Sequence, residues 1–427
     1  MKEKGKETEF YDELETMPRR EKEEYLNRKV QEQVQYAYEH APAMRAKLDK
    51  AGVKPSDIRT VKDMEKIPIT TKDELIDLRK ADPPWGGLLG VPPEKLEAVY
   101  MSPGPIYDIK SLDKNFSHRV QKALYTGGFR KGDLVVNTWA YHMAPVAHWF
   151  DEAIRRIGGT VIPMGVGNTE LQVQVLNDLP VTGWMGTSGF LHTIFAKAEE
   201  MGYDVRRDFS LQVALAGVEM GGAVMRRMFE AKYGLNTFDL YGTADIGIVA
   251  YECNQKSGMH ICEEAVIEIV DPTTGKQLGP GEAGQIVVTP FDNTYPLIRF
   301  GTGDLSSYVD EPCPCGRTSL KLTKVLGRIG DAVRTRGMFI HPRQIGEVIS
   351  KFPEISRHQV VVTRPKFRDE VVIKVELADE TIDKDKLAAA VLKAFPDVCR
   401  VRADRVEFVP KGTIPEGAKG IVDERVY

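Results

Sequence analysis

Apolar residues recur along this chain in distinct patterns, and each pattern predicts a different kind of element. Near the start, Leu26, Val30, Val34 and Ala37 repeat at helical spacing within a charged background, which predicts an amphipathic helix. Further on, short apolar runs bounded by Gly or Asp alternate with helical stretches. The apolar runs are residues 133–140, 159–165, 211–217 and 238–242, and the helical stretches are residues 118–129 and 223–234. This alternation predicts an α/β domain with a mainly parallel sheet.

The pattern changes to strands from Ala265 onward. Two β-rich runs there are joined by a Gly/Pro turn region, which predicts an antiparallel hairpin. After Gly327, two strands, a helix and a further strand follow, enough for a small α+β unit. We therefore expect an N-terminal domain over residues 1–327 and a C-terminal domain over residues 328–427. Within the first, a helical lead-in covers about 8–80 and a β subdomain about 262–327.

The composition is that of a globular protein without a strong charge bias. The chain has 427 residues, more than one compact core usually holds, and 42% of them are hydrophobic. Its formal net charge is −4 with both signs interspersed, which argues against a nucleic-acid partner or an anionic membrane. The first residues are polar, and no segment approaches an uninterrupted apolar span, so we expect a cytoplasmic protein.

Four residues form a candidate metal site. Five cysteines in this length do not make a disulfide framework. The candidate ligands are Cys253, His260, Cys313 and Cys315, in the order C-x6-H followed by C-x-C-G. Three thiols and an imidazole make a closed tetrahedral set suited to structural Zn²⁺, with separately buried cysteines as the alternative. Cys262 is a substitute candidate ligand, and Cys399 is expected to be a small core residue.

A second group of motifs suits a nucleotide site that runs into a domain hinge. The motifs are YGTADIG (241–247), PLIRFGTGDLS (296–306), EPCPCGRT (311–318) and GRIGDAVRTRG (327–337). They present Thr243 and Asp245 on one glycine turn, Asp304 on another, and Arg328 between glycines. The loop with Thr243 follows a predicted strand, and the carboxyl ends of parallel strands are where open α/β sheets bind ligands. An ordinary turn and a solvated basic loop are the function-free alternatives.

These motifs resemble the adenylate-forming superfamily, and CPCGRT, GMH and PLIR resemble its phenylacetate-CoA ligase branch. The resemblance covers most of the chain, including the lead-in from Phe10 to Leu78 and the final hundred residues. It implies a large α/β adenylate-forming domain with mainly parallel sheets and a small mobile α+β C-terminal domain. It also implies ATP or AMP, Mg²⁺ and coenzyme A as cofactors, a small-molecule carboxylic acid as substrate, and a homodimer.

The resemblance assigns roles to particular residues. Those expected along the adenine or acyl pocket and beside the α-phosphate are Gly217, Val218, Glu219, Tyr241, Gly242 and Thr243. Asp304 resembles the carboxylate that accepts hydrogen bonds from both ribose hydroxyls, and Arg328 resembles a hinge-side arginine that contacts the nucleotide. Asp245 stands where the family usually has Glu, and a carboxylate there is suited to holding Mg²⁺.

The chain departs from the family pattern at Gly301, at Gly330, and in two segments that bear on the chemistry. The phosphate-binding loop usually resembles SSGTTGKP, but residues 102–108 read SPGPIYD, in which two prolines remove N–H donors and Asp108 repels phosphate. Near the C-terminus, residues 412–425 resemble a segment that normally reads EGKAxRVID, with Lys419 displaced by one residue. A catalytic lysine there stabilises charge that develops at the α-phosphorus, and an ordinary surface lysine is the alternative.

An acyl pocket is expected along residues 137–150, which concentrate aromatic side chains and two histidines. Tyr141 and His142 are the expected substrate-binding residues, whereas Trp149 and Phe150 are expected to pack in the core. Aromatic walls favour a planar aryl acid.

Taken with the resemblance, the sequence favours an enzyme that activates an organic acid with ATP to an acyl adenylate. Transfer to coenzyme A would follow rotation of the C-terminal domain. One alternative keeps the fold but handles a preformed acyl adenylate, acyl thioester or nucleotide conjugate without using ATP productively, which the altered loop would explain. Another is a non-catalytic nucleotide- or acyl-CoA-binding protein.

Overall fold

The computed structural model describes most of the chain, and it divides into two compact units. The described residues are 9–102, 106–217, 222–282, 284–325, 327–329, 333–336, 338–340, 342–379, 381–399 and 401–425. The first unit comprises Met1–Ser102 and Tyr107–Ile329, and the second comprises Pro103–Ile106 and Gly330–Tyr427. The division falls after Ile329, whereas the sequence pattern placed the boundary after residue 327. Arg328 therefore lies in the first unit.

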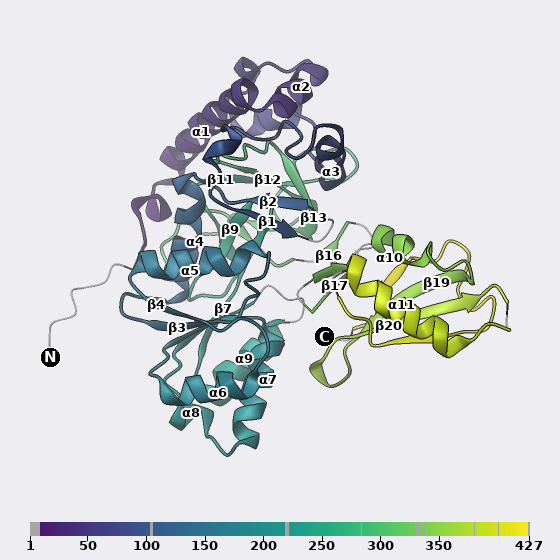
Figure 1. Ribbon diagram of the computed structural model, residues 1–427. Coiled ribbons are helices and arrows are strands. Elements are labelled where there is room, and N and C mark those ends of the chain that lie inside the picture. Colours follow the sequence, from purple (N-terminus) through teal and green to yellow (C-terminus); the bar gives the residue numbers. More distant parts are fainter. Residues whose placement is uncertain are drawn as a thin grey trace. The chain divides into compact units, whose positions relative to one another are not determined.

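Helices form the beginning of the first unit (Figure 1). They are the 3-10 turns η1 (Glu13–Thr16), η2 (Pro55–Asp57) and η3 (Val61–Lys66) and the helices α1 (Arg19–His40), α2 (Pro42–Ala51) and α3 (Lys72–Ala81). Helix α1 is amphipathic as predicted, since Val30 and Val34 are fully buried in one cluster with the strand residue Ile286. Helix α3 begins after Thr71, whose hydroxyl accepts from the backbone N–H of Glu74 in a capping box.

A five-stranded parallel sheet forms the centre of the α/β part. Its strands are β3 (Leu134–Asn137), β4 (Thr160–Pro163), β5 (Gly183–Gly186), β6 (Val213–Ala216) and β7 (Asn236–Phe238), in the order β4-β3-β5-β6-β7. All neighbouring pairs are parallel, which confirms the predicted sheet.

Helices cover both faces of this sheet (Figure 1). They are α4 (Lys114–Gly127), α5 (Pro145–Ile157), α6 (Thr169–Asp178), α7 (Ser188–Glu200), α8 (Val205–Asp208) and α9 (Gly222–Tyr233). Val135 packs with residues of α4 and α5, whereas its neighbour Val136 packs with residues of α6 to α9. Successive strand residues point to opposite faces, so an uninterrupted apolar strand buries both.

Two larger antiparallel sheets and a two-stranded pair complete the first unit. One has the order β14-β15-β10-β9-β8 and the other the order β11-β12-β13-β16. Their strands are β8 (Leu240–Thr243), β9 (Gly247–Glu252), β10 (Met259–Ile261), β11 (Ala265–Val270), β12 (Gly284–Pro290), β13 (Phe300–Ser306), β14 (Tyr308–Val309), β15 (Lys321–Leu322) and β16 (Gly327–Arg328). Strands β11 and β12 pair antiparallel from Ala265 opposite Pro290 to Val270 opposite Gln285, which is the predicted hairpin. A short turn η4 (Pro93–Lys95) precedes the two-stranded pair β1 (Val99–Ser102) and β2 (Ile106–Ile109).

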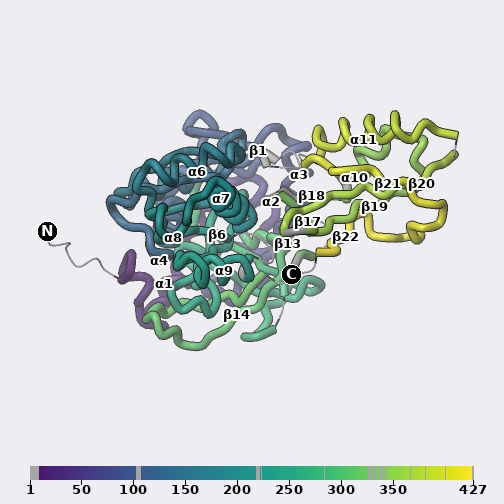
Figure 2. The backbone as a smooth tube through the Cα atoms, turned by 90° about the horizontal axis from the view of Figure 1, so that it is seen from below, coloured from purple at the N-terminus to yellow at the C-terminus, as the bar shows by residue number. Residues whose placement is uncertain are grey.

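The second unit is a small α+β fold. Its elements are β17 (Val333–Thr335), β18 (Met338–Ile340), α10 (Pro342–Ile349), β19 (Ile355–Thr363), η5 (Pro365–Phe367), β20 (Glu370–Leu377), α11 (Lys384–Cys399), β21 (Arg405–Phe408) and β22 (Ile421–Asp423). Strands β21-β20-β19-β22 form one sheet, and Figure 2 shows α10 and α11 along one face of it. Val348 of α10 and Phe395 of α11 are fully buried against Ile373 of the sheet.

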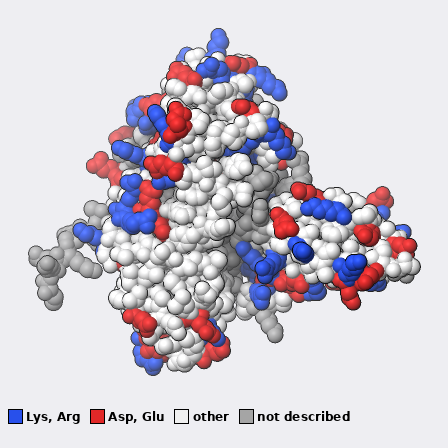
Figure 3. Space-filling model, viewed as in Figure 1, with Lys and Arg blue, Asp and Glu red and all other residues white. Residues whose placement is uncertain are grey.

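The charged surface is mixed. Figure 3 shows lysines and arginines interspersed with aspartates and glutamates on the visible face of each unit. Among the described residues, every helix is too short or too polar to cross a bilayer.

Candidate functional site

Tyr241 of β8, Asp304 of β13 and Arg328 of β16 meet between two sheets of the first unit. Asp304 and Arg328 are partners in the antiparallel pair β13–β16, and Arg328 donates from Nε to Oδ1 of Asp304 at 2.7 Å. The hydroxyl of Tyr241 donates to Oδ2 of the same carboxylate at 2.9 Å. Burial, and then the charge of Asp304, holds the pKa of Tyr241 well above its usual range, so the phenol stays a donor. Three residues predicted for one nucleotide are thus in contact.

Three glycines shape the backbone of the candidate nucleotide site. Gly303 of the TGD turn has φ 77°, a left-handed conformation that side chains disfavour. At Gly217, which directly follows β6, an added Cβ would lie 2.0 Å from Oδ1 of Asp239, so a larger residue would displace that side chain. Val218 and Glu219, the other residues predicted on this loop, lie outside the described residues. Gly242 follows a register shift between β8 and β9 that redirects the strand toward Thr243.

Thr243 and Asp245 carry buried polar atoms with unused hydrogen-bonding capacity. Oγ1 of Thr243 and Oδ1 of Asp245 have no hydrogen-bond partner among the described residues. The other oxygen of Asp245 lies 3.4 Å from Nζ of Lys72, and its side chain is only 2% exposed. A buried carboxylate oxygen and a hydroxyl are oxygen ligands of the kind that Mg²⁺ takes, so this pair fits the predicted cation.

Helix α3 contributes residues that the sequence interpretation missed. Lys72 and Arg79 are seven residues apart, which is two helical turns, and so they share one face. Arg79 donates from Nη2 to the hydroxyl of Tyr295 at 2.7 Å. Burial raises the pKa of Tyr295, while Arg79 lowers it and Asp245 raises it, so these three groups share one electrostatic environment. The seven-residue spacing of two cations was the signal that would have drawn attention to them.

The four predicted metal ligands lie together. Their ligand atoms all lie within 4.8 Å of one another, and all four residues are buried. The Sγ atoms of Cys253 and Cys313 are 3.8 Å apart, and Sγ of Cys315 is 3.4 Å from Nε2 of His260. A tetrahedral ion with a Zn–S distance of about 2.3 Å needs sulfur atoms about 3.8 Å apart. The set therefore fits a zinc ion.

The surroundings of this cluster suit metal binding. Nδ1 of His260 lies 3.3 Å from the hydroxyl of Ser319, an outer contact that leaves Nε2 directed at the cysteines. Burial, with the charges of Arg317 and Lys321, lowers the pKa of His260 to about 4, so the imidazole is neutral at pH 7 as a ligand must be. Burial raises the pKa of Cys253 to about 12 without metal, so a metal ion must displace its proton.

The two cysteines outside this cluster lie in hydrophobic cores. Cys262 packs in the hydrophobic cluster of α4 and the parallel sheet, so it is not a substitute ligand. Cys399 is fully buried in the core of the second unit, as expected.

The metal-ligand segment anchors the beginning of the chain. Arg317, two residues after Cys315, donates from Nε to Oε1 of Glu15 at 2.5 Å, and both side chains are almost fully buried. Thr318 donates from its backbone N–H to the carbonyl oxygen of Glu15 at 3.0 Å. The hydroxyl of Tyr251 donates to the same carboxylate at 3.0 Å. The segment around η1 is therefore held by residues about three hundred positions away.

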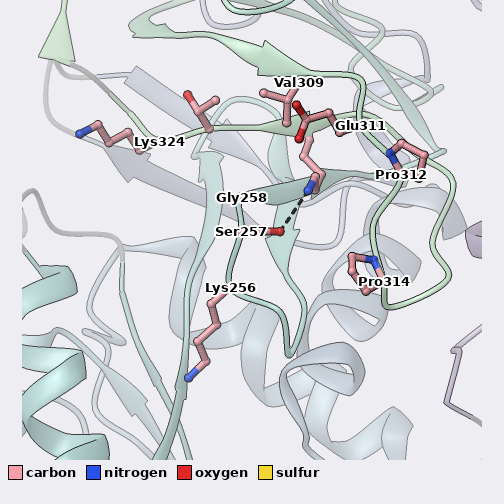
Figure 4. A pocket seen from close by; sticks show the side chains of 10 residues that line it. Lys256, Ser257, Gly258, Val309, Glu311, Pro312, Pro314 and Lys324 are labelled. Atoms are coloured by element: carbon pink, nitrogen blue, oxygen red, sulfur yellow. Dashed lines mark hydrogen bonds between the residues drawn. The ribbon is translucent and has the colours of Figure 1, made fainter.

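A groove borders the segment that carries Cys313 and Cys315, since Pro312 and Pro314 line it. It has a volume of about 600 Å³ and is lined on one side by residues 256–258 and on the other by residues around Glu311 and Lys324. Figure 4 shows Lys256 and Lys324 directed away from each other, and the dashed bond joins Lys321 to Ser257 at 3.0 Å. The lysines do not converge on one point, so the groove has no organised charge.

The predicted acyl-pocket residues lie in different environments. Tyr141 is half-buried and donates to Oδ1 of Asp151 at 2.8 Å, and its backbone oxygen lies 3.2 Å from Nε2 of His148. His142 is exposed. Trp149 and Phe150 are buried in the core, as expected.

Lys419 lies in the second unit, on the loop before β22, and is exposed. Its backbone oxygen accepts from Nε2 of Gln359 at 3.1 Å, which ties this loop to β19.

Comparison with known proteins agrees with this architecture. Residues 337–425 match the family of the AMP-binding enzyme C-terminal domain. Over 440 residues the chain is 31% identical to a phenylacetate-coenzyme A ligase of Thermus thermophilus, an alignment that covers 96% of this chain and 97% of that protein. The chain belongs to the phenylacetate-coenzyme A ligase family. A family member from Escherichia coli is 31% identical over 363 residues, covering 82% of this chain and 81% of the relative.

A solved structure shows the same fold as this family member. A crystal structure of 2-hydroxyisobutyryl-CoA ligase in complex with 2-HIB-AMP and CoA matches it with a TM-score of 0.91 and 24% identity. The match covers 99% of this chain and 94% of the other. The fold of that ligase thus includes counterparts of both the α/β unit and the small α+β unit described above.

Proposed function

We propose that this family member activates an organic carboxylic acid with ATP and transfers the acyl group to coenzyme A. A carboxylate oxygen attacks the α-phosphorus, the bond to the β-phosphate breaks, and pyrophosphate leaves with the electron pair. The sulfur of coenzyme A then attacks the acyl carbon, and AMP leaves. An aryl acid is the favoured substrate class because aromatic side chains concentrate in residues 137–150.

The observation that carries this proposal is the Asp304 carboxylate held between Arg328 and Tyr241. An ionised carboxylate offers about four acceptor positions, so two remain for the ribose hydroxyls after the two observed bonds. Charge-assisted hydrogen bonds of this kind are strong and directional. In this proposal Gly217 and Gly242 border the base and the α-phosphate, and Asp245 with Thr243 holds Mg²⁺, which supplies charge neutralisation at the phosphates.

Lys419 is the proposed catalytic lysine of the adenylation step. An ammonium group at the α-phosphorus stabilises the negative charge that develops there. Tyr141 and His142 are the proposed contacts of the acid, in which His142 reads a polar substituent.

Structural zinc is a separate part of the proposal. Cys253, His260, Cys313 and Cys315 hold the ion, and their role is to fix β10 against the loop that carries Arg317. By family resemblance we also propose a homodimer, and from the composition we propose a cytoplasmic location. Light scattering tests the first and cell fractionation tests the second.

The deciding experiment is acid-dependent pyrophosphate–ATP exchange across a panel of aryl and short aliphatic acids, followed by mass spectrometry of the acyl-CoA product. Exchange with at least one acid, together with its CoA thioester, supports the proposal. Binding of AMP without exchange for any acid contradicts it.

A second candidate is favoured by the altered loop at residues 102–108, whose prolines remove N–H donors. In that case the protein acts on a preformed acyl adenylate or acyl thioester. Formation of acyl-CoA from a synthetic acyl adenylate, in the absence of exchange with ATP, distinguishes this outcome.

A further inference from the structure

Helix α3 places two positive charges beside the residues proposed to hold the nucleotide. Nζ of Lys72 lies 3.4 Å from Oδ2 of Asp245. Arg79, on the same face of the helix, donates a hydrogen bond to the hydroxyl of Tyr295. The negative charge of Asp245 contributes to the raised pKa of that hydroxyl, so Asp245 is close to it as well. The sequence interpretation placed this helix in the helical lead-in of about residues 8–80 and assigned none of its residues to the nucleotide site.

The start of α3 is fixed to the strand that carries Asp304. Thr70 is fully buried, and its backbone N–H donates to the carbonyl oxygen of Arg299 at 2.8 Å. The N–H of Gly301 donates back to the carbonyl oxygen of Thr70 at 2.9 Å, so residue 70 forms a parallel bridge with Phe300 of β13. Helix α3 therefore begins beside β13, and its position is set by backbone bonds and not by a flexible loop.

Three buried polar atoms of this region have no hydrogen-bond partner among the described residues. They are Nη1 of Arg79, Oγ1 of Thr243 and Oδ1 of Asp245. Buried polar atoms are rarely left without a hydrogen-bond partner, so the presence of these three together indicates a polar ligand. A guanidinium N–H donates to phosphate oxygens, while a carboxylate and a hydroxyl accept a divalent cation. The combination fits a polyphosphate with its cation.

Residues 102–108 lack the lysine that the phosphate-binding loop SSGTTGKP of the adenylate-forming superfamily carries. Residues 102–108 contain no lysine or threonine, and they lack two N–H donors because of Pro103 and Pro105. When pyrophosphate leaves, negative charge rises on its oxygens and needs a cationic partner. Some other element must supply it if ATP is the substrate.

We propose that Lys72 and Arg79 bind the β- and γ-phosphates of ATP and the pyrophosphate that is released, in place of a lysine-bearing phosphate loop. This inference rests on the proposed function. In the ligand-free protein Lys72 instead neutralises Asp245. Arg79 keeps its bond to Tyr295 through Nη2 and offers Nη1 to the phosphate.

The test is isothermal titration of the full-length protein with magnesium pyrophosphate and, separately, with AMP. Loss of one charge-assisted contact should weaken pyrophosphate binding by about tenfold or more in Lys72→Ala and in Arg79→Ala. AMP, which lacks the β- and γ-phosphates, should bind within about twofold of wild type. Lys80→Ala is the matched control, because Lys80 is an exposed cation on the same helix and should change neither affinity.

A variant that keeps the charge guards against an effect of misfolding. Arg79→Lys retains a cation but loses the planar fork, so pyrophosphate binding should fall less than in Arg79→Ala. Thermal unfolding of each variant within a few degrees of wild type shows that α3 remains folded.

Other outcomes overturn the inference in distinguishable ways. If wild type binds AMP but Lys72→Ala and Arg79→Ala bind pyrophosphate as wild type does, α3 does not hold the phosphates and the nucleotide site stands. The same conclusion follows if wild type binds AMP but not pyrophosphate. If wild type binds neither, the proposed function fails together with this inference.

Discussion

Arg328 and Asp304 face each other across the antiparallel pair β13–β16, and Nε of the guanidinium lies 2.7 Å from Oδ1 of the carboxylate. Both side chains are largely buried, with 21% and 10% exposed. The pairing of two short strands therefore sets this contact, which places a fixed anion at the candidate ribose position. Residue pairs that are aligned by backbone bonds before a ligand arrives lose little entropy when it binds.

Replacing Asp304 by Asn should weaken AMP binding. The amide keeps the shape but loses the charge that strengthens hydrogen bonds from ribose hydroxyls, which is worth about 1.5–3 kcal/mol. We expect an affinity about 10-fold to 100-fold lower by isothermal titration. Asp178→Asn, an equal charge change on the exposed end of α6, is the control and should bind AMP normally. Unchanged affinity in Asp304→Asn would remove this carboxylate from the site.

Purified wild-type protein should contain about one zinc ion per chain, measured by mass spectrometry of the metal. Cys313→Ser should lose it and unfold at a lower temperature, because metal binding energy is part of the folding energy. Cys399→Ala removes a buried thiol of the second unit and should retain the zinc. If wild-type protein from cells grown in zinc-supplemented medium contains no zinc, that result contradicts the proposed metal site.

Removing Arg317 should destabilise the first unit. Its partner Glu15 is fully buried, and breaking a buried ion pair costs about 3–5 kcal/mol because the remaining charge has no counter-ion. We expect urea unfolding of Arg317→Met to show a loss of this size, and limited proteolysis to cut near residue 15. The double variant Glu15→Gln with Arg317→Met should recover part of the stability. If it is no more stable than the single variant, the pair is not the cause.

The buried Lys122 should make stability depend on pH. Its Nζ lies 2.8 Å from both Glu263 and Glu264 and 3.0 Å from Asp12. Burial raises the pKa of Glu263, but Lys122 and then Lys22 outweigh it and lower that pKa. The stabilisation that ionised Glu263 contributes to folding is therefore fully present at pH values above its unfolded pKa of about 4.3. It is lost as the pH falls through the lower pKa of the folded state.

The variant Lys122→Met should reverse this dependence. Without the ammonium, the pKa values of the neighbouring carboxyls rise, so the variant gains stability as pH falls from 8 toward 5. Lys114→Met, an exposed position on the same helix, should follow the wild-type curve. Chemical denaturation at several pH values measures this, and a loss in Lys122→Met that is equal at pH 5 and pH 8 would refute the electrostatic account.

Lys419→Ala should separate the two half-reactions. Removing a group that stabilises charge in the transition state lowers a rate by about 10²–10³. We expect this loss in pyrophosphate–ATP exchange but not in acyl-CoA formation from a synthetic acyl adenylate. Lys411→Ala, an exposed lysine nearer the start of the same loop, is the control. Full exchange activity in Lys419→Ala would leave the catalytic lysine unassigned.

Much of the fold followed from local pattern. The alternation of apolar runs and helical stretches gave the parallel sheet, and the change of pattern at Ala265 gave the antiparallel hairpin. These predictions were confirmed because the burial of one or both faces of an element produces a regular spacing of hydrophobic residues in the sequence. The four candidate metal ligands, which the structure brings together, could also be predicted from the sequence, since thiols are rare and the spacing in residues 313–315 is itself local.

The position of polar groups was decided by the tertiary structure. Lys72 meets Asp245 across 173 positions, and Arg317 meets Glu15 across 302. Lys72 and Arg79 belong to a helix with many charged residues, and its sequence is compatible both with a solvent-exposed face and with a ligand-binding face. The spacing of hydrophobic residues shows which face of a helix or strand is buried. It does not show which partner a charged side chain will contact. Only the packing of α3 beside β13 brings those charges to the candidate phosphate site.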